Sequence, residues 1–108
     1  MGVLQRFEQR LDGLVNGAFA KAFRSEVQPV EIAGALQREI DDKAVPLGPD
    51  RTVGPNSFTV ELSPHDHDRL GPYAHALGAE LSSMVKEHAD AVGVALLGPV
   101  EVELARAT

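Results

Sequence analysis

The chain has 108 residues, of which 44% are apolar, and its formal net charge is −6. This length is typical of one compact domain, and the absence of cysteine excludes disulfides, thiolate metal sites and cysteine nucleophiles. No apolar run approaches the roughly 20 residues that a membrane-spanning helix needs, and the N-terminus lacks the continuous apolar core of a signal peptide. The composition predicts a single cytoplasmic domain over residues 1–108.

Charge is distributed unevenly along the chain. Residues 1–24 contain four basic and two acidic residues, a net charge of +2, whereas residues 45–108 contain four basic and nine acidic residues, a net charge of −5. An acidic surface repels phosphate backbones, which disfavours general nucleic-acid binding. The first helical hairpin therefore offers the candidate surface for polar contacts with a partner, through Arg6, Arg10 and Arg24.

Residues 3–23 are predicted to form an amphipathic helix. Apolar residues recur there at steps of three and four, which is typical of a helix with one buried stripe. Gly13 and Gly17 each cost up to about 1 kcal/mol of helix propensity relative to alanine, which suggests that another backbone approaches closely. The alternative is a helix lying on a membrane surface, but the polar face is poor in lysine.

A second helix is predicted to begin at Pro29, which suits a first helical turn, and to end near residue 44 before Pro46. Residues 45–56 contain three prolines and two glycines, and are predicted to be loop or irregular edge strand, with a short strand at 51–53. A turn at 54–56 then leads into a strand at 57–62, where apolar and polar residues alternate.

The segment after this strand, Ser63-Pro64-His65-Asp66-His67-Asp68, is either a helix start or a chemical site. Serine is a preferred N-cap, proline suits the first turn, and an acidic residue three places after the cap is favourable. Two histidines two residues apart on a helix point about 200° apart, because each residue turns about 100°. Metal-binding pairs on helices are three or four residues apart, so the segment predicts a helix start and no metal site.

Catalytic and cofactor motifs are missing from the sequence. Ser63 is not surrounded by Gly-x-Ser-x-Gly, and no glycine-rich phosphate motif occurs. Ser82 and Ser83 fall inside the third predicted helix without an evident acid–base partner. The chain is predicted not to be an enzyme and to need no cofactor.

The third helical region extends from about residue 64 to 91 and ends at Gly93. Gly71-Pro72 should kink or split it, because proline removes an amide donor and clashes with the preceding turn. Residues 94–104 are predicted to be one long strand, bent or bulged at Gly98-Pro99. The order α-α-β-β-α-β predicts an α+β domain with its helices packed on one face of a small three-stranded sheet.

A split third helix would also give the order α-β-β-α-α-β once the first helix is omitted, which resembles a type II KH domain. Such RNA-binding domains carry a Gly-x-x-Gly loop between two helices to clamp the nucleic-acid backbone. Residues 68–72 have a single glycine and an acidic approach. KH-like nucleic-acid binding is therefore the alternative interpretation.

Residues 1–15, 25–39 and 55–70, together with Gly98-Pro99-Val100, resemble the N-terminal domain of FhaA-type proteins of actinobacteria. Members of this family usually join this domain, through a long flexible linker, to a forkhead-associated domain that recognises phosphothreonine. They are associated with Ser/Thr protein kinases that control peptidoglycan synthesis and cell division. The 108 residues contain neither linker nor forkhead-associated domain, so the resemblance transfers no phosphothreonine-binding residue.

The residues and the resemblance together predict a non-enzymatic protein–protein interaction module in kinase-linked control of cell-wall synthesis and division. Its expected partners are proteins of the kinase or cell-wall synthesis machinery, contacted through Arg6, Arg10 and Arg24. We expect the module to be cytoplasmic, with recruitment to the inner face of the cell membrane through those partners.

Overall fold

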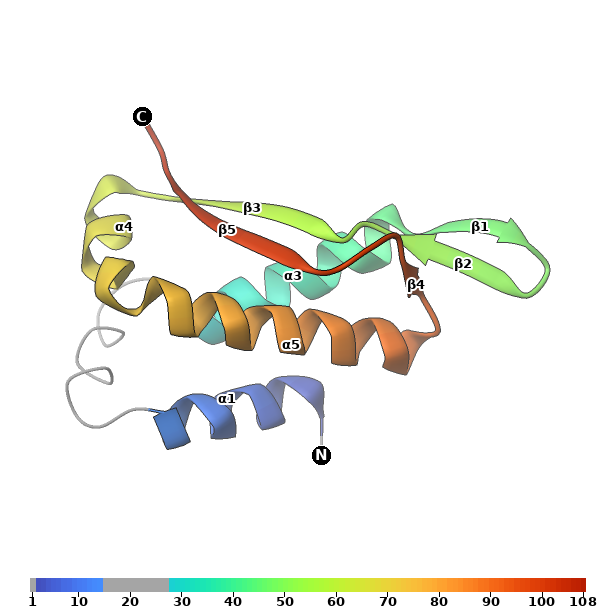
Figure 1. Ribbon diagram of the computed structural model, residues 1–108, viewed down its shortest axis with the longest axis horizontal. Helices are drawn as coiled ribbons and strands as arrows, with labels where there is room; N and C mark the ends of the chain where they lie inside the picture. The colour runs from blue at the N-terminus through green and yellow to red at the C-terminus, as the bar shows by residue number, and fades with distance from the viewer. Residues whose placement is uncertain (1, 15–27) are drawn as a thin grey trace.

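The computed structural model describes residues 2–14 and 28–108. Its elements in chain order are α1 (Val3–Leu14), α3 (Pro29–Lys43), β1 (Val45–Gly48), β2 (Arg51–Gly54), β3 (Ser57–Leu62), α4 (Pro64–Leu70), the 3-10 turn η1 (Gly71–Tyr73), α5 (Ala74–Val92), β4 (Ala95–Leu96) and β5 (Glu101–Arg106). Figure 1 shows α1, α3 and α5 on one side of an elongated layer of strands. The predicted α+β class and the one-sided packing of the helices are confirmed.

The strands form two small sheets, where the sequence predicted one sheet of three strands. One sheet has the order β1-β2-β4, and the other consists of β3 and β5 alone. The β1–β2 pair is an antiparallel hairpin that projects from one end of the molecule (Figure 1), whereas the β2–β4 and β3–β5 pairs are parallel. Residues 45–48, which lie in the segment predicted to be loop or irregular edge strand, therefore form β1.

The two sheets are joined because two long strands break at the same place. The first continues from β2 into β3 and does not fold back at residues 54–56, and the second continues from β4 into β5. The bend predicted at Gly98-Pro99 is a complete break, consistent with proline being unable to donate to a ladder. The pairing shifts by two residues across the break, from Gly54 opposite Leu96 to Ser57 opposite Glu101.

The helix boundaries follow from local chemistry. The backbone N–H of Asp66 donates to Ser63 Oγ at 3.1 Å, so Ser63 caps α4 as predicted. The Gly71–Tyr73 turn separates α4 from α5, which confirms the predicted interruption of the third helix. Gly93 ends α5 with a φ of 75°, a left-handed conformation that favours glycine. The predicted second helix is confirmed as α3, and the part of the first predicted helix beyond Leu14 lies outside the described residues.

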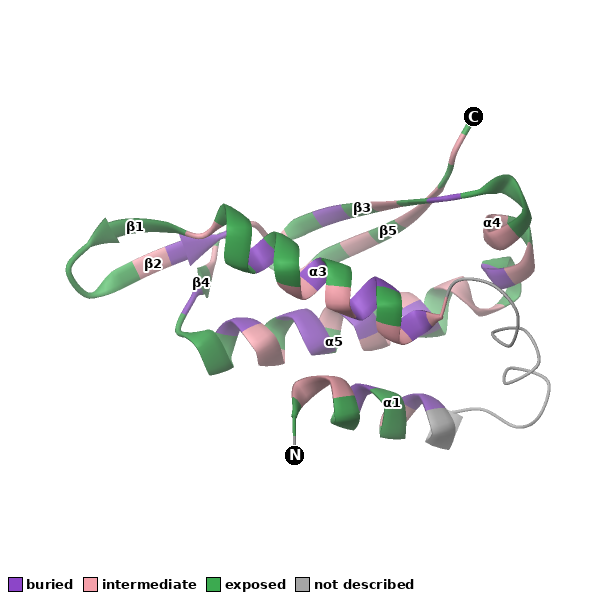
Figure 2. Ribbon diagram, turned by 180° about the vertical axis from the view of Figure 1, so that it is seen from behind, coloured by how far each residue is buried: buried purple, intermediate pink, exposed green. Residues whose placement is uncertain are grey.

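The core lies where α5 meets α1, α3 and the strands. Four side chains of α5 are completely buried: Leu77, Leu81, Met84 and Val85. They pack in one cluster with buried residues of the other elements, which include Phe7 of α1, Ile40 of α3 and Phe58 of β3. Figure 2 shows buried stretches on α1, α3, α5 and β3, whereas β1 is exposed along its whole length. Most of the apolar stripes predicted from the sequence therefore form a single core.

Candidate functional site

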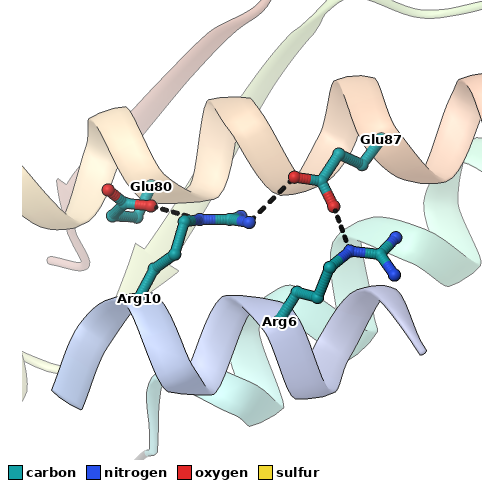
Figure 3. A network of polar contacts seen from close by, with 4 residues as sticks. All are labelled: Arg6, Arg10, Glu80 and Glu87. Atoms are coloured by element: carbon teal, nitrogen blue, oxygen red, sulfur yellow. Dashed lines mark hydrogen bonds and ion pairs between the residues drawn. The ribbon is translucent and has the colours of Figure 1, made fainter. Parts of the chain in front are cut away.

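The arginines of α1 that were predicted to contact a partner form ion pairs with α5 (Figure 3). Arg10 Nε donates to Glu80 Oε1 at 2.7 Å, and Arg10 Nη1 donates to Glu87 Oε1 at 2.8 Å. Arg6 Nε donates to the other oxygen of Glu87, at 3.1 Å. Glu80 and Glu87 are seven residues apart, close to two helical turns, and so lie on the same face of α5. The network joins the first helix to the longest helix of the domain.

From the sequence alone, Arg6 and Arg10 were assigned to a partner surface. In the structure both arginines pair with acidic residues of α5. The side chain of Arg10 is 30% exposed, and its Nη2 atom is buried without a hydrogen-bond partner. Breaking the pairs would leave two acidic side chains facing α1. Arg24 lies outside the described residues. A role of the three arginines in partner contact stays a prediction, and it requires a partner to compete with Glu80 and Glu87 for Arg6 and Arg10.

The histidine- and aspartate-containing segment at residues 63–68 is the start of α4. Asp66 Oδ1 accepts a hydrogen bond from Arg69 Nη2 at 3.0 Å, and Asp68 Oδ1 lies 3.5 Å from Arg106 Nε on β5. Both carboxylates therefore have arginine partners within the fold. Within residues 2–14 and 28–108, no three histidine, aspartate or glutamate side chains form a group that could hold a metal ion. The helix-start interpretation is confirmed by the Ser63 cap.

A groove that the sequence did not predict lies between α3 and the strands. Its volume is about 590 Å³, within the usual range for binding sites in proteins. The lining comes from four parts of the chain: Ala35, Leu36, Glu39 and Lys43 of α3; Val45, Val53, Gly54 and Pro55; Ser57, Phe58, Thr59 and Val60 of β3; and Leu97. Glu39 and Lys43 are the charged members of this lining.

Two residues that line this groove carry large apolar side chains that are exposed. Val45 is 52% exposed and Leu97 is 69% exposed, and both belong to the lining. Leu47, on the same hairpin strand as Val45, is 64% exposed. These residues fall outside every helical or strand stripe identified in the sequence. The apolar residues Val45 and Leu47 within a predicted loop were the signal that could have indicated this surface, whereas Leu97 lay within the strand predicted at 94–104.

The groove is suited to binding and offers little chemistry. Its polar side chains are Ser57, Thr59, Glu39 and Lys43, and no histidine lies in the lining to activate a hydroxyl group. The exposed apolar side chains favour contact with another apolar surface. No helix in the described part of the chain is both long enough and apolar enough to cross a membrane.

The fold and the groove define a small α+β domain with a partly apolar groove suited to binding. Residues 4–108 match the family described as FhaA, N-terminal domain. The chain therefore belongs to the FhaA N-terminal domain family, which confirms the resemblance seen in the sequence.

Two relatives support this assignment. Over 69 residues, 64% of this chain, the sequence is 35% identical to the FHA domain-containing protein FhaA of Mycobacterium tuberculosis. The match spans only 13% of that protein, so its overall activity and partners cannot be transferred directly. The structure is also similar to the solved Rv0020c N-terminal structure, with a TM-score of 0.72 and 26% identity over 86% of this chain and 70% of that chain.

Proposed function

We propose that this domain is a non-enzymatic protein-interaction module that acts in Ser/Thr-kinase-linked control of cell-wall synthesis and division. The observation that carries the proposal is the groove beside α3, which is lined by the exposed side chains of Val45 and Leu97, with the exposed Leu47 on the same strand as Val45. Exposed apolar side chains that gather in one place mark interaction sites, because covering them removes apolar area from water. Membership of the FhaA N-terminal family supports the regulatory setting.

The kinase-linked role rests on the family, and the contact surface rests on the structure. We place the main contact at the groove and treat the α1 surface as a second, weaker candidate. Arg6 and Arg10 on that surface already have acidic partners on α5, whereas Leu97 and Leu47 project from the fold. Recruitment to the inner face of the cell membrane would follow from binding to partners located there.

Site-specific photo-crosslinking in the cells that produce the protein tests this function. A photoreactive amino acid at Leu97 would report on the groove, and one at the exposed Gln9 would report on α1. Cross-linked proteins are identified by mass spectrometry. We expect the Leu97 position to capture kinases or proteins of cell-wall synthesis. Capture at Gln9 alone would move the contact to α1, and capture of neither class at either position would reject the function.

A KH-like nucleic-acid-binding domain is the second candidate. The separation of α4 from α5 by a 3-10 turn meets the condition on which this alternative depends. The turn itself reads Gly71-Pro72-Tyr73, without the second glycine of a Gly-x-x-Gly clamp. Filter binding of labelled single-stranded RNA at physiological salt distinguishes the protein-interaction module from a KH-like domain. Sequence-dependent retention would favour the KH-like function over the protein module.

A further inference from the structure

Strand β3 has one edge that pairs with no described residue. Its partner in the two-stranded sheet is β5 alone. The backbone N–H of Glu101 donates to the carbonyl of Asn56 at 2.8 Å, and that of Ala107 donates to the carbonyl of Leu62 at 2.9 Å. In a parallel pair, alternate residues of one strand bond to the same neighbour. The backbone groups of the even-numbered residues from 56 to 62 therefore point toward β5. Those of Ser57, Thr59 and Glu61 point to the opposite side.

This opposite side is the groove beside α3. Side chains of a strand alternate between two faces, yet four consecutive residues, Ser57 to Val60, line the groove. Consecutive residues can share one hollow when the hollow runs along the edge of the strand. The open edge of β3 and the α3 groove are thus the same place. An added strand there would find backbone donors and acceptors of β3 on one side and Ala35, Leu36, Glu39 and Lys43 of α3 on the other.

Two other strand edges in the described part of the chain, those of β1 and β5, are protected against such pairing. Edge strand β1 contains Pro46 and a break in register next to it, both of which discourage the addition of a strand. The far edge of β5 lies close to α5, where the carbonyl oxygen of Val102 is 3.8 Å from the position of a Cβ on Gly78. By contrast, β3 has no proline and keeps a regular register over all six residues.

The two faces of the edge specify the side chains of its occupant. Toward the helices, the groove presents Leu36, Phe58 and Val60. On the outer face, Glu61 of β3 lies on the same side as Glu101 and Glu103 of β5, which are paired with Ser57 and Thr59. These outer residues are exposed. An added strand would therefore place apolar side chains inward, and its outer side chains would gain from being basic.

We infer that an extended segment of a partner protein, with alternating apolar and basic residues, adds to the open edge of β3 as a third strand. The main-chain hydrogen bonds to Ser57, Thr59 and Glu61 supply affinity, and the alternating side chains supply specificity, as in other cases of strand addition. The inference rests on the proposed function, since it names the kind of protein segment that the groove accepts.

The direct test uses a fluorescein-labelled synthetic octapeptide of alternating valine and lysine, titrated with the 108-residue domain by fluorescence anisotropy. Two further peptides carry backbone N-methyl groups, one on the valine amides and one on the lysine amides. Only the amides that face β3 lose hydrogen bonds, so one methylated peptide should bind about tenfold or more weakly and the other nearly normally. No binding of the parent peptide, or equal effects in both methylated peptides, would overturn the inference.

The methylated peptides also report the direction of the added strand. The backbone groups of Thr59 face the peptide, and a lysine lies opposite Thr59 on the outer face. In an antiparallel pair that lysine exchanges both hydrogen bonds with Thr59, whereas in a parallel pair the flanking valines make them. Loss on methylating the lysine amides indicates an antiparallel strand, and loss on methylating the valine amides indicates a parallel one.

A pair of protein variants tests the electrostatic part. Glu61→Lys places a positive charge beside the basic side chains of the added strand and should weaken binding by about three- to tenfold. Glu8→Lys makes the same change of net charge at an exposed site on α1, and should leave binding unchanged. Equal effects of the two variants would reject local recognition at β3. If a partner cross-links at Leu97 while the peptides fail, the interaction function stands and only strand addition is rejected.

Discussion

Asn56 Nδ2 donates a hydrogen bond to the carbonyl of Pro99 at 2.9 Å, and this contact joins the two points at which the long strands break. Asn56 lies between β2 and β3, and Pro99 lies between β4 and β5. The bond therefore holds the two strand breaks next to each other. The pairing of β3 with β5 begins just after this contact, with Ser57 opposite Glu101.

Removal of this side-chain bond should destabilise the domain. Asn56→Ala loses one hydrogen bond at a partly exposed site, so we expect a loss of about 0.5–1.5 kcal/mol in the free energy of unfolding. Asn56→Asp should cost at least as much, because a carboxylate cannot donate to the carbonyl. Urea denaturation followed by circular dichroism measures both. Ser57→Ala, at the adjacent exposed residue, is the control and should change stability by less than about 0.5 kcal/mol.

The Arg10 network predicts that α1 is held to α5 partly by charge. Arg10→Gln removes the pairs to Glu80 and Glu87, and we expect a loss of about 0.5–1.5 kcal/mol that decreases at high salt. Glu8→Gln, on an exposed face of the same helix, should have almost no effect. Equal stability of the Arg10 variant and the wild type at low salt would show that the network contributes nothing.

The same network changes how the predicted α1 contacts must be tested. Charge reversal at Arg6 and Arg10 places acidic groups against Glu80 and Glu87, so weaker partner capture could result from a displaced helix alone. We expect Arg6→Glu/Arg10→Glu to lower the thermal midpoint as well as any binding. A compensated variant, with Glu80→Arg and Glu87→Arg added, should recover the midpoint. Recovery of stability without recovery of partner capture would support the α1 arginines as true contacts.

Local features of the fold could be predicted from the sequence, and pairing across the fold could not. The Ser63 cap and the Gly93 helix end depend on neighbouring residues, and both were predicted where they occur. Alternation at residues 57–62 predicted a strand with one buried face, but it does not identify a partner. That partner, β5, begins 44 residues later and runs parallel, across the whole of α4 and α5.

The candidate site shows the same limit. Arg10 was identified as a polar contact, but its acidic partners lie 70 and 77 residues away, and charge counting cannot find them. The groove needs α3, the β1–β2 hairpin and β3 to be placed together before it exists. In the sequence, the exposed Leu47 and Leu97 are simply apolar residues that belong to no periodic stripe.

The Ser63 cap allows a prediction about the segment that resembled a metal site. Ser63→Ala should lower stability by about 1 kcal/mol, because the N–H of Asp66 loses its acceptor at the start of α4. Ser63→Asp keeps an acceptor at the same position and should retain most of the stability. If the segment instead served a metal, then added zinc would raise the thermal midpoint and His67→Gln would abolish that rise. We expect no zinc-dependent rise in either protein.

The exposed leucine beside the groove separates binding from folding. Leu97 is 69% exposed, so Leu97→Asp should change the free energy of unfolding by less than about 0.5 kcal/mol. The same variant places a charge in an apolar contact and should strongly reduce cross-linking at a reporter on Leu47. Leu36→Asp, in contrast, charges a buried position of α3 and should unfold the domain. A folded Leu97→Asp protein that retains full partner capture would show that the groove is not the contact surface, because a charge placed in an apolar contact should weaken binding there.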